Sequence, residues 1–212
     1  MPHEPIQPEP YSVVGHYLTG VDYQHSPNIG DRFTVPPFLI VLHYTAGSSY
    51  SSAIDHLCNP AHRVSAHVVI GRDGRVAQLV PFHTIAWHAD PSSWAGYCML
   101  IAHSIGIELD NAGELQMEDG FPTTWFGRKI PTSEAVRLTH RHQSYPGYWH
   151  NYPDIQVQRV ERICRSLCAA YPIRAIVGHD DIAPERKWDP GPAFPMDSLR
   201  ARLGLFVPRA VA

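Results

Sequence analysis

The chain lacks a surplus of basic residues, a long apolar run and a dense set of cysteines. Its 212 residues include 17 Lys and Arg against 20 Asp and Glu, which gives a formal net charge of -3. Without excess positive charge there is little to neutralise phosphates, so we expect no general binding of nucleic acid. No stretch reaches the ~20 apolar residues of a membrane-spanning helix, so we expect no membrane span.

The four cysteines are too few for a disulfide framework in a chain of this length, and we expect reduced thiols. The N-terminal residues show no basic segment followed by an apolar run, which is the pattern of a secretory signal. The chain as written is therefore expected to stay in the cytoplasm, unless a route that ignores such signals exports it.

The composition fits one globular domain, because 44% of the residues are hydrophobic and the length allows a real core. Residues 1–36 are rich in proline and polar groups, which predicts an irregular N-terminal arm. Apolar runs and helical patterns interleave over 37–206, and 207–212 form a tail. This interleaving predicts an α/β fold with a mixed central β-sheet flanked by helices.

Apolar runs and turn residues set the expected elements. Asp73-Gly74 favours a hairpin turn, and residues 154–171 show the clearest amphipathic stripe. Strands are expected at 37–42, 65–70, 76–80, 104–109 and 173–178, and helices at 49–58, 132–143, 154–171 and 196–203.

Residues 113–148 are interpreted as an extended loop insert. Its aromatic side chains either form a lid or a glycan-stacking wall, or pack on the core. These aromatic residues are Phe121, Trp125, Phe126, Tyr145, Tyr148 and Trp149.

The segment 178–192 carries the densest set of reactive side chains. It holds a histidine, several carboxylates and a lysine, with prolines that restrict the backbone. It follows the apolar pair Ile176-Val177, which predicts the end of a buried strand. Such a loop is suited to holding polar groups in one arrangement, as a metal site requires.

Polar side chains also follow or interrupt other predicted strands. His43, His179 and Asp189 together offer two nitrogens and one oxygen, the donor set of a catalytic zinc site with one open position. Glu108 then suits proton transfer, and the ammonium of Lys187 suits stabilisation of a developing oxyanion.

Each of these residues has a structural alternative. His43 and His179 can be hydrogen-bonded histidines without a metal, and Asp189 can be a turn residue before Pro190. Glu108 is the hardest to explain structurally, because glutamate is rarely placed in an apolar strand unless it is paired or used.

Taken together, six motifs resemble one known family. The chain is similar to the type-2 N-acetylmuramoyl-L-alanine amidases, AmpD-like zinc enzymes that share a fold with peptidoglycan-recognition proteins. The resemblance spans about residues 37–206 and rests on residues 42–46, 65–67, 73–74, 86–89, 104–109 and 178–192.

The resemblance implies one Zn²⁺ per chain, held by His43, His179 and Asp189, with Glu108 and Lys187 assisting catalysis. It implies hydrolysis of the amide between the lactyl group of N-acetylmuramic acid and L-alanine of the stem peptide. The partner is then peptidoglycan or a soluble muropeptide. Residues expected near the substrate cleft are Tyr44, Trp87, His88 and His67. For His67, a strand residue beside the site, a structural role is the favoured alternative.

Three alternatives stay open at this point. The first is a non-catalytic module that binds muropeptide on the same fold, and the second is a zinc amidohydrolase for another peptide. The third is a purely structural or interaction protein. The sequence leaves undecided whether the substrate is intact wall or a soluble fragment, and it does not reveal the oligomeric state.

Overall fold

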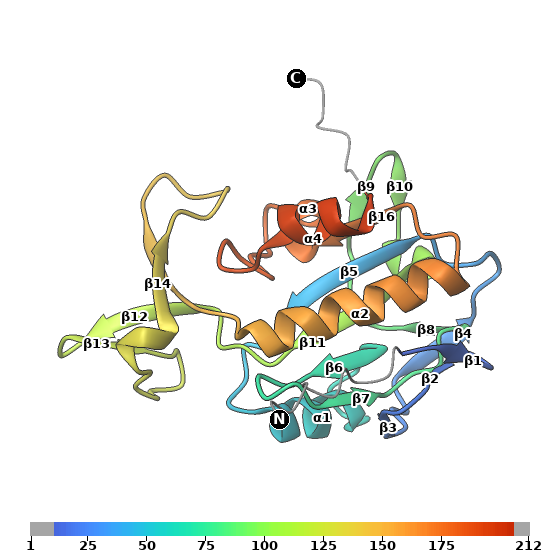
Figure 1. The fold of residues 1–212 in the computed structure, drawn as a ribbon, viewed down its shortest axis with the longest axis horizontal. Coiled ribbons are helices and arrows are strands. Elements are labelled where there is room, and N and C mark those ends of the chain that lie inside the picture. Colours follow the sequence, from blue (N-terminus) through green and yellow to red (C-terminus); the bar gives the residue numbers. More distant parts are fainter. Residues whose placement is uncertain (1–10, 206–212) are drawn as a thin grey trace, which may run out of the picture.

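A six-stranded mixed sheet runs through the molecule (Figure 1). The structure is a computed structural model and describes residues 11–205. The strands, in their order across the sheet, are β16 (Ala175–Gly178), β5 (Leu39–Tyr44), β11 (Ser104–Leu109), β6 (Val68–Ile70), β7 (Val76–Gln78) and β3 (Asp22–Tyr23). Neighbouring strands are parallel except β6 and β7, which form an antiparallel hairpin. The predicted α/β fold with a mixed central sheet is therefore confirmed.

One face of this sheet is covered by two helices. In α2 (Asp154–Ala170), Val160, Ile163, Cys164 and Leu167 are fully buried. They pack with alternate residues of β5 and β11 and with Leu199 of α4 (Met196–Leu203). The strand residues on this face are Ile40, Leu42, Ile105, Ile107 and Leu109. Because side chains alternate along a strand, His43 and Glu108 lie on the opposite face.

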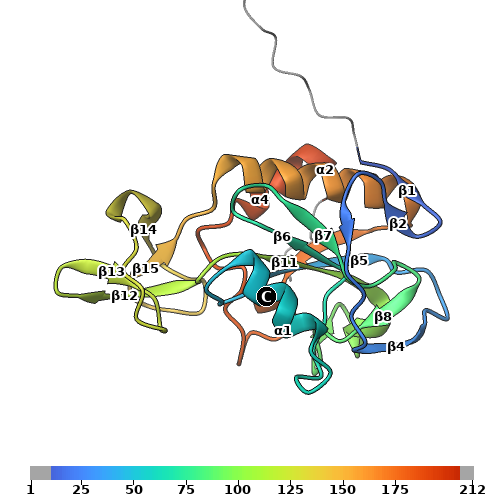
Figure 2. The same cartoon turned by 90° about the horizontal axis from the view of Figure 1, so that it is seen from below.

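The helix α1 (Tyr50–Cys58) lies on the other side of the sheet from α2 and α4 (Figure 2). Ser49 caps it: its hydroxyl accepts from the Ser52 amide, and the Ser52 hydroxyl accepts from the Ser49 amide. The buried residues of α1 pack on β6 and β7. The cap and helix fix the segment 45–49, which leads directly from β5.

The predicted loop insert is an antiparallel sheet that projects from one end of the molecule (Figure 1). Its strand order is β13 (Phe121–Thr123), β12 (Glu114–Glu118), β15 (Gly147–His150) and β14 (Ala135–Leu138). We call residues 113–150 the β-insert. It joins β11 to α2, so it starts at the end of the strand that carries Glu108.

The helix predicted at 132–143 is wrong. This stretch forms the short 3-10 helix η2 (Thr132–Glu134) followed by β14, which pairs with β15. Its apolar residues do not recur at helical spacing. Backbone pairing with β15 supplies the hydrogen bonds instead.

The N-terminal arm also has more order than its composition predicts. Residues 11–36 contain β1 (Val13–Val14), β2 (Tyr17–Leu18), β3 and β4 (Ile29–Arg32). The strand β3 extends the central sheet, and β4 pairs with β8 (Thr84–Ala86). The buried Asn28 donates to the Leu57, Asn59 and Val64 carbonyls, which ties the arm to α1. Residues 1–10 and the predicted tail 207–212 lie outside the described residues.

The remaining elements are short. The hairpin of β9 (Ser93–Trp94) and β10 (Tyr97–Cys98) precedes the 3-10 helix η1 (Leu100–His103), and α3 (His179–Ile182) follows β16. All four cysteines are free thiols, as predicted. Among residues 11–205, no helix combines the length and apolarity that crossing a membrane needs.

Candidate active site

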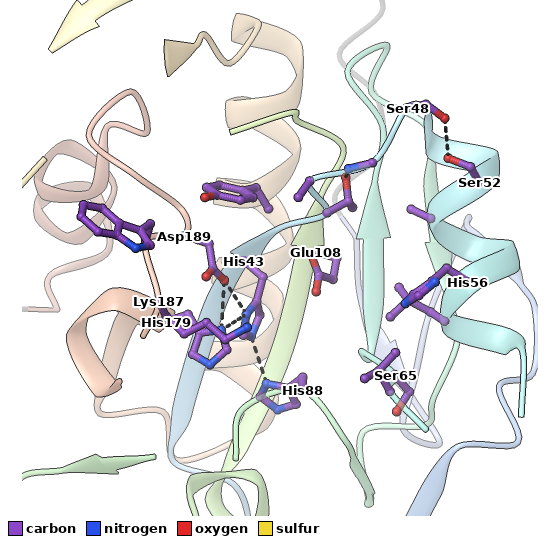
Figure 3. Close-up of a pocket in the computed structure, with 18 of the residues that line it drawn as sticks. His43, Ser48, Ser52, His56, Ser65, His88, Glu108, His179, Lys187 and Asp189 are labelled. Carbon is purple, nitrogen blue, oxygen red and sulfur yellow. Dashed lines mark hydrogen bonds and ion pairs between the residues drawn. The ribbon is translucent and has the colours of Figure 1, made fainter. Parts of the chain in front are cut away.

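The predicted site residues converge where three parallel strands end. His43 stands near the end of β5, His179 directly follows β16, and Glu108 stands near the end of β11. Since β5 lies between the other two strands, these side chains reach the same edge of the sheet. Asp189 approaches them from the loop after α3, and Figure 3 shows the side chains directed toward one another.

Three atoms form a nearly equilateral triangle. Nδ1 of His43 lies 3.0 Å from Nδ1 of His179 and 2.9 Å from Oδ2 of Asp189. The third side, from Nδ1 of His179 to Oδ2 of Asp189, is 3.1 Å. In the described part of the chain this is the one group of histidine, cysteine and acidic residues arranged to hold a metal ion. The three atoms are close enough for a single divalent ion to contact all of them.

The charges at this triangle also favour a cation. Asp189 is 7% exposed. Burial by itself raises its pKa, but close contact with the His179 and His43 rings outweighs burial and holds the pKa below its usual range. Burial lowers the pKa of His179 to about 4, so its ring is neutral near pH 7. A buried carboxylate facing the neutral ring of His179 lacks a full counter-charge, which a divalent ion would supply.

Two aspartates that follow His179 hold the loop in place. The Asp180 amide donates to the Asp189 carbonyl at 2.9 Å, and the Asp180 carboxylate lies 3.0 Å from Nε2 of the buried His140. Asp181 accepts from the Gly178 amide and from Arg200, both at 2.8 Å. These contacts fix the distance between His179 and Asp189. Sequence reasoning missed the contribution of His140, because it comes from the β-insert.

Glu108 is placed for proton transfer. It stands opposite His43 in the pairing of β11 with β5. Its Oε2 is buried without a hydrogen-bond partner, although buried polar atoms are nearly always paired. Burial raises the pKa of Glu108 to about 7, against the lowering effect of His43. A carboxylate of this kind can both accept and release a proton near neutral pH.

A pocket of about 770 Å³ opens over this triangle. His43, Glu108, His179 and Asp189 form part of its lining, together with Lys187. Further walls come from α1 and its preceding loop and from the tip of the β-insert. The lining residues contributed by the β-insert are Trp125 and Phe126.

Three of the four residues predicted to contact substrate line this pocket, namely Tyr44, Trp87 and His88. His67 does not reach the pocket, since its side chain is 0% exposed, which fits the structural alternative. Its Nε2 donates to the Thr84 carbonyl at 2.9 Å, and its Nδ1 accepts from the Gly106 amide at 3.0 Å. His67 is therefore a structural residue that joins β11 to the first residue of β8.

Comparison with known proteins decides the family. Residues 34–192 match the family model described as N-acetylmuramoyl-L-alanine amidase. The chain belongs to this family. The resemblance inferred from the six motifs is thus confirmed.

Two curated relatives illustrate the similarity. The family member 1,6-anhydro-N-acetylmuramyl-L-alanine amidase AmpD of Salmonella typhimurium (strain SL1344) is 36% identical over 145 residues, covering 68% of this chain and 59% of AmpD. The N-acetylmuramoyl-L-alanine amidase AmiD of Escherichia coli (strain K12) is 32% identical over 170 residues, covering 76% of this chain and 51% of AmiD. The matched region thus spans little more than half the length of either relative.

Solved structures of family members show the same fold. A crystal structure of a Se-Met AmpD derivative has a TM-score of 0.63 and 30% identity, covering 89% of this chain and 97% of that one. The E. coli AmiD complex with its substrate anhydro-N-acetylmuramic acid-L-Ala-D-gamma-Glu-L-Lys has a TM-score of 0.61 and 30% identity. It covers 93% of this chain and 66% of that one.

We predict that Asp189→Ala abolishes tight metal binding, because the two remaining imidazoles hold a divalent ion weakly. Elemental analysis after dialysis should give about one equivalent for the parent and well under a tenth for the variant. Asp197→Ala serves as the control, since Asp197 is fully exposed on α4. A full equivalent in the Asp189 variant would remove this residue from the ligand set.

Proposed function

We propose that this chain hydrolyses the amide between the lactyl group of N-acetylmuramic acid and L-alanine of the stem peptide. One zinc ion is held by His43, His179 and Asp189. The observation that carries this proposal is the 2.9–3.1 Å triangle of ligand atoms beside the unpartnered Oε2 of Glu108. The relatives AmpD and AmiD are named as amidases of N-acetylmuramyl-L-alanine, which supports this amide as the bond that is cleaved.

The donor set fits zinc in particular. Two imidazole nitrogens and one carboxylate oxygen are a common ligand set of catalytic zinc, with bond lengths of ~2.0–2.2 Å. Tetrahedral ligands at such distances lie roughly 3.3–3.5 Å apart. The three atoms of this site need to separate by only a few tenths of an ångström to reach that spacing. Zinc supplies Lewis acidity, which polarises the amide carbonyl and makes water a better nucleophile.

The protein groups then move the proton and hold the charge. Glu108 accepts a proton as water attacks the lactyl carbonyl carbon, and it delivers that proton to the alanine nitrogen as the C–N bond breaks. The ammonium of Lys187 lies in the lining and stabilises negative charge on the carbonyl oxygen. Water is consumed, and a lactyl carboxylic acid and a free amine result.

The tip of the β-insert forms a wall for the sugar. The Trp125 side chain is 70% exposed, yet its indole N–H donates to the Ala46 carbonyl at 2.7 Å. Phe126 packs edge-on against it, with ring centroids 5.5 Å apart. Arg128 donates to the Ser48 carbonyl at 3.3 Å, which ties the same tip to the loop before α1. A fixed, exposed aromatic face at a pocket rim suits stacking on a sugar ring.

A non-catalytic muropeptide-binding module would not need the buried, unpartnered carboxylate oxygen of Glu108. A zinc hydrolase with another peptide substrate would need the same site, and analysis of the reaction products distinguishes it from the proposed amidase. The expected cytoplasmic location stays a prediction that cell fractionation would check.

Product analysis is the direct test of this function. Soluble anhydro-muropeptide and intact sacculi should each be digested in parallel and analysed by mass spectrometry. We expect a free stem peptide that begins with L-alanine and a glycan that carries an intact lactyl acid. Cleavage within the peptide or between the sugars would contradict the proposal. The relative rates on the two substrates show which one the enzyme prefers.

We predict that Glu108→Gln lowers kcat on the order of 10²-fold or more, because the amide cannot accept the proton. The variant should keep about one equivalent of zinc, since Glu108 is not a ligand. Glu185→Gln is the matched control, an exposed residue on the loop before Asp189. Parent-like kcat for Glu108→Gln would exclude Glu108 as the proton carrier.

We predict that Trp125→Ala raises KM by roughly 2- to 10-fold for a substrate with its sugar, while kcat changes little. The control is Tyr145→Ala, another aromatic residue of the β-insert that is 63% exposed and does not line the pocket. An unchanged KM for Trp125→Ala would show that this face does not bind the sugar.

A further inference from the structure

His88 lies against the far side of the ligand His43. Its Nδ1 is 3.0 Å from Nε2 of His43, the nitrogen that points away from the metal triangle (Figure 3). Its other nitrogen, Nε2, is 3.3 Å from the hydroxyl of Ser104. Both ring nitrogens of His88 therefore have protein partners, and one of these partners is a ligand.

The hydroxyl of Ser104 fixes the direction of these hydrogen bonds. Ser104 donates its single hydrogen to the Leu100 carbonyl at 2.6 Å. It can then only accept from His88, so Nε2 of His88 carries a hydrogen. A second hydrogen on Nδ1 would place an imidazolium beside a divalent ion with no carboxylate partner, which Coulomb repulsion disfavours. Nδ1 of His88 is therefore an acceptor.

An acceptor at this position determines which tautomer His43 adopts. Nε2 of His43 must donate to His88, and a neutral imidazole carries only one hydrogen. Nδ1 of His43 is then left with a lone pair. This is the atom that faces Nδ1 of His179 and Oδ2 of Asp189.

We propose that Ser104 and His88 form a hydrogen-bond relay that locks His43 in the tautomer whose Nδ1 binds the metal ion. This inference rests on the metal site of the proposed function. It assigns His88 as a positioning residue, where the sequence predicted contact with substrate. Hydrogen bonds of this kind orient ligands and typically affect metal affinity by 10- to 100-fold.

Gly106 provides the space that His88 needs. A Cβ at Gly106 would lie 2.5 Å from Cγ of His88 and 2.6 Å from its Nδ1, much closer than atoms approach without bonding. The Gly106 amide is held by Nδ1 of His67, whose ring lies edge-on to His88 with centroids 5.8 Å apart. The absence of a side chain at Gly106 thus leaves room for the His88 ring beside β11.

The matched variants are His88→Asn and His88→Leu, which have nearly the same shape. The asparagine oxygen can occupy the position of Nδ1 and accept from His43, whereas leucine cannot. Zinc affinity of the full chain should be measured by competition with a chelator. We expect leucine to weaken zinc binding about 10- to 100-fold and asparagine to restore most of it. Melting temperatures of the zinc-free variants report whether each one folds.

A second measurement needs no variant. Nitrogen-15 NMR of the zinc-loaded parent should show the His88 hydrogen on Nε2 and the His43 Nε2 hydrogen bonded to Nδ1 of His88. A His88 hydrogen on Nδ1 would overturn the relay. Parent-like zinc affinity in folded His88→Leu would also overturn it, as would equal weakening by leucine and asparagine. Neither zinc affinity nor NMR requires substrate. If the relay is found but the protein does not cleave muropeptides, only the proposed function is contradicted.

Discussion

The carboxylate of Asp189, enclosed between two imidazoles and largely out of water, is the interaction on which the rest of the site depends. Its oxygen lies 2.9 Å from His43 and 3.1 Å from His179. A buried negative charge is costly unless a cation balances it. The three groups come from two strand ends and a loop that are distant in sequence. The parallel sheet brings them together, and the Asp180 hydrogen bonds hold the loop in register.

Two kinds of support surround this centre. Buried polar contacts orient the ligands, with Ser104 and His88 behind His43 and with His140 behind Asp180. On the open side, the pocket is bounded by α1 and by the aromatic tip of the β-insert. The ligand geometry therefore depends on the parallel strands of the central sheet, while the shape of the substrate wall depends on an insert between β11 and α2. The two parts are linked by His140 of the β-insert, which lies 3.0 Å from the Asp180 carboxylate.

The strands and helices that carry the site could be predicted from the sequence. The apolar run before His43 and the alternation in 104–109 are visible within a short window, and so is the stripe of α2. The β-insert could not be predicted in this way. Its strands pair with partners up to 35 residues away, so local patterns predict a helix and a loop where β14 and β15 form.

The same distinction between local patterns and distant contacts applies to the functional residues. The motifs predicted which side chains meet at the pocket, because residue type and strand position carry that information. They did not predict the hydrogen-bond partners of His67 and His88, which stand in the separate motifs 65–67 and 86–89. The His67 ring bonds only to backbone atoms, whereas the His88 ring bonds to the metal-binding residue His43. Such partners depend on packing between distant segments, which the sequence does not display.

Zinc K-edge X-ray absorption of the zinc-loaded protein tests the central claim most directly. Two imidazole nitrogens and one carboxylate oxygen predict a first shell of nitrogen and oxygen atoms at about 2.0–2.2 Å, with the multiple scattering of two imidazole rings. A sulfur shell near ~2.3 Å, or a shell without imidazole scattering, would contradict a metal centre built from His43, His179 and Asp189.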